Sequence, residues 1–383
     1  MKKLIFIATL LATSIYGQTF EQYQKEQNSA YKKYETDLNK EFQAYKKAQD
    51  EAFKEFSKEL GKKWPTQNGK ADISTKHKFV EYSKDLTTKK SVDYKKQEIS
   101  LEVIAKTEQE AKAKIEKMFK NLLNEDVKKA FKKDILDKKI AKKLKKQRVT
   151  PQTTQKIIAD IISKRDRSKM LQRLKKKRLK VVKYKGSFIY KANIKLPSDT
   201  TVKKAKKLKS LVLKNSSKQK IPAELIYAII HSESSFNPMA RSGIPAFGLM
   251  QIVPRSAGVD SYMYLFKKKR VLSSGYLYTP KKNIMIGSGY LHILYYRYLK
   301  NIKDPQSRLY CTIAAYNTGA GNVAKAFIGN TNIYKAAKKI NQMSSDKVYK
   351  TLMRRLPYNE TKHYLKKVND RVSAYNKLLQ NRL

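Results

Sequence analysis

The chain has 383 residues, enough for two ordinary domains and an extension. Lys and Arg number 85 against 32 Asp and Glu, and the resulting net charge of +53 favours an anionic partner: nucleic acid, acidic lipid or an acidic polymer. The single cysteine, Cys311, excludes an intrachain disulfide, and its apolar surroundings predict a packed side chain.

The first residues predict export. Two lysines precede a short apolar run from Leu4 to Ala12, and a small residue follows at Gly17. This pattern is typical of a secretory signal peptide, because the run is too short to span a bilayer; an uncleaved anchor is the alternative. We expect residues 1–17 to direct the protein to the periplasm, which argues against nucleic acid as the partner. With no cysteine for a lipid, only charge would hold it at the outer membrane, the cell wall or another anionic envelope surface.

An eleven-residue repeat occupies 20–64, within an expected segment of 18–65. Aromatic residues stand at its first and fourth places: Phe20/Tyr23, Tyr31/Tyr34, Phe42/Tyr45 and Phe53/Phe56. Eleven residues over three turns favour one long helix with an aromatic stripe, which Gly61 and Pro65 should end. The helix is either a spacer or self-association element, or it packs on its own protein.

Residues 66–197 predict a small α+β unit. Alternation and β-branching indicate strands at 78–83, 89–96 and 98–105, and a hairpin at 179–197 turning near Gly186-Ser187. Thr107 and Glu110 form a capping-box pattern before a helix. Lysine-rich helices are expected at 126–147 and 152–179. Basic strands with aromatics can bind nucleic acid, but no recognition motif appears, and solvated lysine faces are the commoner meaning.

Helical patterns fill residues 198–383. A linking helix presents Val202, Ala205, Leu208 and Val212 on one face, and Pro222 stands at the start of the next helix. The expected fold class is therefore α+β multidomain: a long repeat helix, a small α+β domain and a mostly α-helical domain.

Glu233 is the main catalytic candidate from the residues alone. It follows Ile229 and Ile230 at helical spacing, so it extends the apolar face that they begin. Burial there should raise the pKa of its carboxyl, as a general acid requires. The alternative is a glutamate neutralised by a lysine at the helix end. We expect glycine-bearing loops at 237–254 and 316–327 beside it, and the many tyrosines between 262 and 310 suit sugar rings.

Four blocks in order resemble the lytic transglycosylases of the goose-lysozyme-like superfamily. They read "ESSFNP", "SGIPAFGLMQIVP", "YTPKKNIMIGSGYL" and "AAYNTGAGNV", and "LPYNETKHYLKKV" resembles the closing element of that family. The resemblance implies a lysozyme-like catalytic domain at 198–383 with Glu233 as the catalytic acid. The substrate-binding residues that it implies are Ser242, Met250, Gln251, Tyr316, Asn317, Glu360 and Tyr364. Pro245 departs from the family, which usually has glycine there, and stiffens the loop.

The implied reaction needs no metal and no cofactor. Glu233 would protonate the bond between MurNAc and GlcNAc in peptidoglycan and then accept the proton of the MurNAc 6-hydroxyl, closing a 1,6-anhydro ring. Rival patterns fit poorly: "GAGNVA" lacks the acidic partner of a dinucleotide site, and His231-x-Glu233 lacks the cysteines of a zinc deaminase. A hydrolase of the same fold and a catalytically silent wall-binding protein remain open, as does the oligomeric state.

Overall fold

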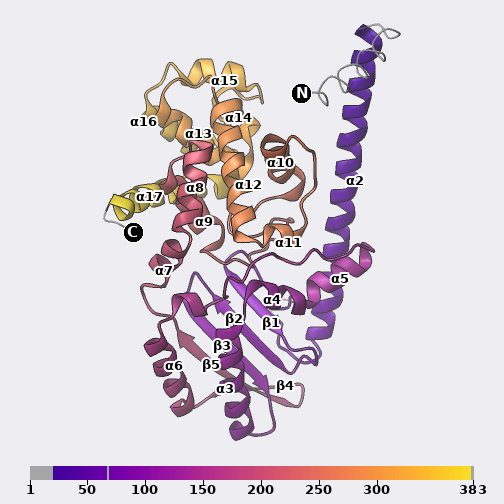
Figure 1. Ribbon diagram of the computed structural model, residues 1–383, viewed down its shortest axis with the longest axis vertical. Coiled ribbons are helices and arrows are strands. Elements are labelled where there is room, and N and C mark those ends of the chain that lie inside the picture. Colours follow the sequence, from indigo (N-terminus) through magenta and orange to yellow (C-terminus); the bar gives the residue numbers. More distant parts are fainter. Residues whose placement is uncertain (1–19, 67–68, 381–383) are drawn as a thin grey trace, which may run out of the picture.

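The computed structural model describes residues 20–66 and 69–380, so the expected signal peptide lies outside the described residues. The chain forms a long helix, a sheet unit (residues 71–197) and a helical unit (residues 198–380), and the long helix runs along the side of both (Figure 1). This confirms the expected fold class. Among the described helices, none is long and apolar enough to cross a membrane.

The sheet unit is built on five antiparallel strands in the order β1-β2-β3-β5-β4. The strands are β1 (Lys78–Tyr82), β2 (Thr88–Asp93), β3 (Glu98–Ile104), β4 (Lys180–Tyr184) and β5 (Ser187–Lys195). The β4–β5 hairpin turns at Lys185 and Gly186, which both have positive φ (45° and 80°). The helix α3 (Glu108–Asn124) packs on β3 and β5, and Thr107 caps it by accepting from the Glu110 amide at 3.2 Å. The predicted strands, hairpin and cap are thus confirmed.

Of the two predicted lysine-rich helical stretches, the first is confirmed as helical but divided in two, and the second was wrong over its first half. The first stretch is two helices, α4 (Val127–Lys133) and α5 (Ile135–Lys143), because the Asp134 side chain caps α5 by accepting from the Asp137 amide. In the second, residues 155–157 run beside 125–127 instead, with backbone hydrogen bonds from Val127 to Gln155 and from Ile157 to Glu125. A 3-10 turn, η1 (Ala159–Ile161), follows, and the helix α6 (Lys164–Lys176) begins only after its cap at Ser163.

The repeat forms the helix α2 (Phe20–Leu60), which ends one residue before Gly61, as predicted. Its last turns pack on the same chain: Ala52, Phe56 and Leu60 are buried, and Phe56 meets Tyr82 of β1 edge to face with 5.8 Å between ring centroids. Ion pairs then join α2 to α5, including Lys139–Glu59 at 2.7 Å and Lys143–Glu55 at 2.5 Å. Of the two interpretations of the repeat, packing on its own protein therefore holds for this part of it.

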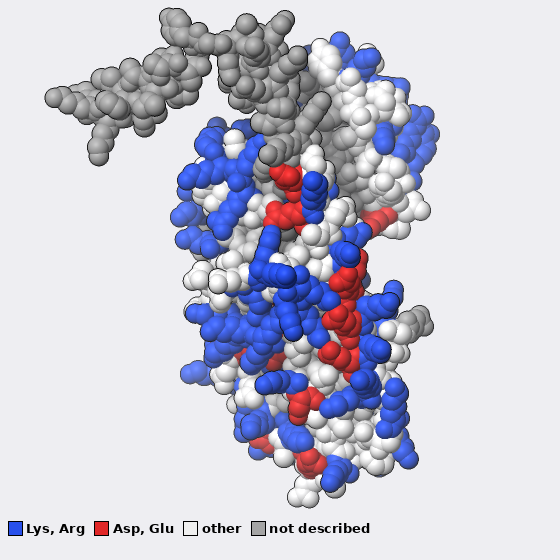
Figure 2. Space-filling view, turned by 90° about the vertical axis from the view of Figure 1, so that its right-hand side faces the viewer, with Lys and Arg blue, Asp and Glu red and all other residues white. Residues whose placement is uncertain are grey.

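The charge is unevenly arranged on the face that carries this contact. In Figure 2, Lys and Arg side chains cover much of the surface, and most of the acidic side chains form a narrow band among them. The α2 glutamates that pair with Lys139, Lys143 and Lys146 are Glu41, Glu51, Glu55 and Glu59. These four glutamates are thus committed to internal pairs, while many basic side chains face solvent.

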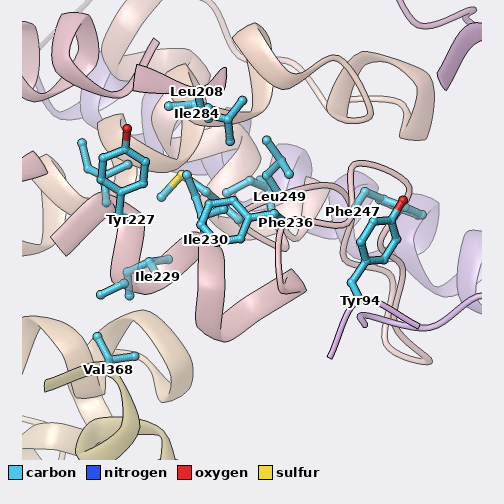
Figure 3. Packing of buried hydrophobic residues seen from close by; sticks show 14 of the residues in the cluster. Tyr94, Leu208, Tyr227, Ile229, Ile230, Phe236, Phe247, Leu249, Ile284 and Val368 are labelled. Carbon is cyan, nitrogen blue, oxygen red and sulfur yellow. The ribbon is translucent and has the colours of Figure 1, made fainter. Parts of the chain in front are cut away.

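The helical unit surrounds the helix α9 (Ala223–Ser234). The other elements are α7 (Thr200–Lys207), α8 (Lys209–Gln219), η2 (Pro254–Gly258), α10 (Val259–Phe266), α11 (Ser274–Leu277), α12 (Pro280–Ile293), η3 (Leu294–Tyr298), α13 (Pro305–Thr318), α14 (Ala320–Ile328), α15 (Ile333–Ile340), α16 (Ser345–Arg355) and α17 (Asn359–Gln380). Ten of the twelve α9 residues are buried, rather than the single apolar face predicted. Figure 3 shows why: Ile229 points toward Val368 of α17, while Ile230 lies among Phe236 and Leu249 on another side.

The prediction of a loop at 316–327 was wrong. Helix α13 runs through Tyr316 and Asn317 to Thr318, Gly319 bends the chain with a φ of 86°, and α14 follows at once. Glycine adopts this φ without the steric cost that a β-carbon would bring, so two helices need no loop between them. Cys311, also on α13, is buried as expected, and burial raises the pKa of its thiol.

Candidate active site

Glu233 lies in the last turn of α9, and only 6% of its surface is exposed. The helix ends at Ser234 because Ser235 and Phe236, which follow it, take left-handed backbone angles (φ 51° and 64°). Burial raises the pKa of the Glu233 carboxyl, and the Lys76 ammonium, 3.8 Å from Oε2, opposes that rise. A buried carboxyl whose pKa is raised keeps its proton nearer to neutral pH, which suits a general acid.

A buried tyrosine, Tyr364, and a half-buried one, Tyr316, face this carboxyl. The pKa values of Tyr364, on α17, and Tyr316, on α13, are raised well above the ordinary value, first by burial and then by the charge of Glu233. The Tyr316 hydroxyl donates to the Met250 carbonyl at 2.8 Å. The Tyr364 hydroxyl lies beside Glu233 and helps to lower the pKa of that carboxyl, but it forms no hydrogen bond of good geometry among the described residues.

The loop that carries Met250 and Gln251 is fixed by a residue that sequence reasoning missed. Asn283, fully buried on α12, accepts from the Met250 amide at 2.8 Å and donates to the carbonyls of Phe247 (2.8 Å) and Leu277 (2.9 Å). A buried amide with three hydrogen bonds holds a loop firmly, because breaking any of them leaves a polar group unsatisfied. The only sequence signal was one amide side chain directly before the apolar run from Ile284 to Ile286.

Gln251 is strained and incompletely bonded. Its φ is 48°, its Nε2 donates to the Gly248 carbonyl at 3.0 Å, and its Oε1 is buried without a partner among the described residues. Non-glycine residues in this backbone region cost free energy and gather at functional sites. The side chain of Met250 packs against Gly287 of α12, where a β-carbon would lie 2.3 Å from its sulfur.

The remaining predicted residues lie on α17, on α13 and on the loop before Pro245. Glu360 is exposed at the start of α17 and still raises the pKa of Glu233 by charge repulsion. Asn317 accepts from the Thr361 hydroxyl at 2.7 Å, which joins α13 to α17. Ser242 lies on the loop before Pro245, and its hydroxyl donates to the Ile244 carbonyl. The side-chain amide of Gln49, on α2, donates to the Ser242 carbonyl at 3.3 Å. The structure thus gathers Glu233, Tyr316, Tyr364 and Glu360, and ties Ser242 to α2.

His231, two residues before Glu233, packs against α17. His231 lies 3.1 Å from the Tyr375 hydroxyl, and burial lowers the pKa of its imidazole to about 3. In the part of the chain that the structure describes, no three His, Cys, Asp or Glu side chains are grouped so that they could hold a metal ion.

Comparison with known proteins identifies the segment around this carboxyl. Residues 210–342 match the family model described as the transglycosylase SLT domain. This match confirms the resemblance to lytic transglycosylases predicted from the sequence motifs. The matched segment holds Glu233, the 241–252 loop and Tyr316, and it ends before Glu360 and Tyr364 of α17.

Individual relatives agree with the SLT match. The membrane-bound lytic murein transglycosylase C of Serratia proteamaculans is 36% identical over 198 residues, covering 49% of this chain and 51% of that protein. The protein of the same name from Haemophilus ducreyi is 36% identical over 220 residues, covering 54% and 55%. The chain thus spans about half the length of the curated relatives it matches. A solved structure of an inactive mutant of the lytic transglycosylase Slt from Pseudomonas aeruginosa has a TM-score of 0.35 at 24% identity, covering 45% of this chain and 24% of that one.

Proposed function

We propose that the protein is a peptidoglycan lytic transglycosylase that cleaves the β-1,4 bond between MurNAc and GlcNAc and leaves 1,6-anhydroMurNAc ends. The observation that supports this most directly is the buried carboxyl of Glu233, with its raised pKa, inside a segment that matches the SLT domain. General acid catalysis requires such a group at the bond to be broken.

In this mechanism Glu233 acts twice. Its carboxyl gives a proton to the glycosidic oxygen as the bond from C1 to that oxygen breaks, and GlcNAc leaves with a free hydroxyl. The resulting carboxylate accepts the proton of the MurNAc 6-hydroxyl while O6 bonds to C1, so the enzyme returns to its starting state without water. One carboxylate suffices because the substrate supplies the nucleophile, whereas ordinary glycosidases need two.

The other residues would position the sugar. Tyr316 and Tyr364 present their rings and hydroxyls beside Glu233, and Oε1 of Gln251, which has no partner among the described residues, can accept from a sugar hydroxyl. Glu360, exposed and close enough to repel Glu233, would stabilise developing positive charge at C1. We propose that Ser242, Met250 and Asn317 contact the sugar at the edge of the same site. We also propose that the domains divide at residues 66 and 198.

The mass of the released sugars tests this reaction. Purified sacculi digested with the full chain should yield muropeptides that lack one water relative to hydrolytic products, because O6 and not water attacks C1. Mass spectrometry of the soluble fraction measures this, with a hydrolytic muramidase digest as control. Products that have gained water would replace the proposal by a hydrolase of the same fold, and no release would favour a silent wall-binding protein.

The net charge leads to a second expectation about the partner. With +53 on the chain and its acids partly committed to internal pairs, binding to anionic sacculi in the periplasm should be largely electrostatic. Raising salt from about 50 mM to about 500 mM shortens the screening length to a few ångströms, so the bound fraction in a pull-down should fall steeply. A bound fraction that does not change with salt would show that contacts at the site dominate binding.

A further inference from the structure

A cation from the sheet unit reaches the catalytic candidate of the helical unit. Lys76 precedes β1 and lies far outside the segment that matches the SLT domain, yet its ammonium is 3.8 Å from Oε2 of Glu233. The Lys76 side chain is 36% exposed and that of Glu233 only 7%. The pair therefore lies where the two units meet, with one partner buried and the other reaching solvent.

Backbone groups hold Lys76 in this place. The Asn237 amide donates to the carbonyls of Thr75 and Lys76, both at 3.3 Å, and the backbone N–H of Arg241 donates to the Thr75 carbonyl at 3.4 Å. The Ser235 hydroxyl lies 3.1 Å from Nδ1 of His77. None of these contacts uses the Lys76 side chain, so a substitution there leaves the junction of the two units intact.

Several other groups also act on the Glu233 carboxyl or lie beside it. From α17 these are Lys367, Glu360 and Tyr364, and from α13 Tyr316; Arg371, His77, Lys95 and His231 act on Lys367 or on one another close by. Of the cations, Lys367 is bonded to the Ser232 carbonyl at 3.2 Å, and Arg371 to the Ser232 hydroxyl at 2.8 Å. Burial, with Arg371 nearby, lowers the pKa of Lys367 to about 8. Lys76 is the cation that forms an ion pair with the carboxylate, and after burial it has the largest effect on the pKa of Glu233.

We propose that the sheet unit completes the active site by presenting Lys76 to Glu233, so that Lys76 acts as a positioning residue for the reaction. The inference rests on the proposed function, since it takes Glu233 as the acid and then the base. Between the two steps Glu233 is a carboxylate, and the nearby ammonium stabilises that charge. Lys76 thus makes proton release to the leaving oxygen easier.

The sign of the pH effect follows from the two opposing influences. Burial raises the pKa of Glu233 and Lys76 lowers it. Activity that requires the protonated acid falls as pH rises through that pKa, so removing the cation moves the fall to higher pH. Because Lys76 is partly exposed and screened by solvent, we expect Lys76→Gln to shift the alkaline limb of kcat/KM upward by about 0.5 to 1 pH unit.

The experiment compares pH profiles of kcat/KM for three variants of the full chain on soluble peptidoglycan strands. Lys76→Gln should show the upward shift, and Lys76→Arg should restore the wild-type limb because the charge returns. Lys96→Gln removes one exposed charge from the same unit and should leave the limb in place. A wild-type limb in Lys76→Gln, or failure of Lys76→Arg to restore it, would overturn the inference. Failure of the proposed function looks different, since wild type would then release no anhydro sugars at any pH.

Discussion

Glu233→Gln is expected to lower glycan cleavage by at least about a hundredfold, because the amide keeps the size and polarity of the carboxyl but cannot deliver a proton. Binding to glycan strands should survive, since the side chain is buried in the last turn of α9 and the amide fits the same space. Release of soluble muropeptides measures cleavage, and co-sedimentation with sacculi measures binding. Retention of most of the activity would remove Glu233 from the mechanism.

Glu360→Gln is the matched comparison for this result. Glu360 is exposed and acts on Glu233 through its charge, so we expect a milder loss of rate than at Glu233. An equal loss at both positions, together with products that have gained water, would indicate a hydrolase that uses two carboxylates.

Gly248→Ala should damage both the stability and the rate. The φ of Gly248 is +75°, and a β-carbon there would lie 2.3 Å from the Leu277 carbonyl oxygen and 2.4 Å from Nδ2 of Asn283. Strain and overpacking together should lower the free energy of unfolding by about 3 kcal/mol, and the melting temperature by several degrees. Because Asn283 holds the Met250 amide, the displaced loop should also slow cleavage, by up to about a hundredfold.

The control for this variant lies in the same loop. A β-carbon at Gly243 meets nothing within 4 Å, so Gly243→Ala should melt and cleave like wild type. Thermal unfolding followed by circular dichroism and the cleavage assay check both variants. Wild-type behaviour of Gly248→Ala would show that the loop can move without cost.

The sequence predicted correctly those elements that depend on residues close together along the chain. The strands, the β4–β5 hairpin, the Thr107 cap and the end of α2 depend on neighbours within a few residues, and these predictions were confirmed. The lysine-rich stretch from 152 was predicted to be helical. It is extended at 155–157 because its backbone pairs with residues 125–127, a contact that no local pattern carries.

In the candidate site, too, only the features that depend on a single helix could be predicted from the sequence. Burial of Glu233 follows from its spacing after Ile229 and Ile230 on one helix, so its raised pKa could be predicted. Lys76 and Asn283 could not be found, since each acts on a residue of another element across a tertiary contact. The junction of two helices at Gly319 was predicted as a loop, because glycine and asparagine are common both in loops and at the ends of helices.

The helix α17 shows that the segment matching the SLT domain is not a self-contained unit. The SLT match ends at residue 342, yet α17 covers α9 along its length, and Tyr375 stacks on Tyr227 with 5.2 Å between ring centroids. One continuous apolar core also links Phe79 of β1 with Leu225 of α9 and Leu365 of α17. Cutting the chain at the edges of the match would uncover this core on two sides, so the segment grafted onto another scaffold would lose its fold before its chemistry could be tested.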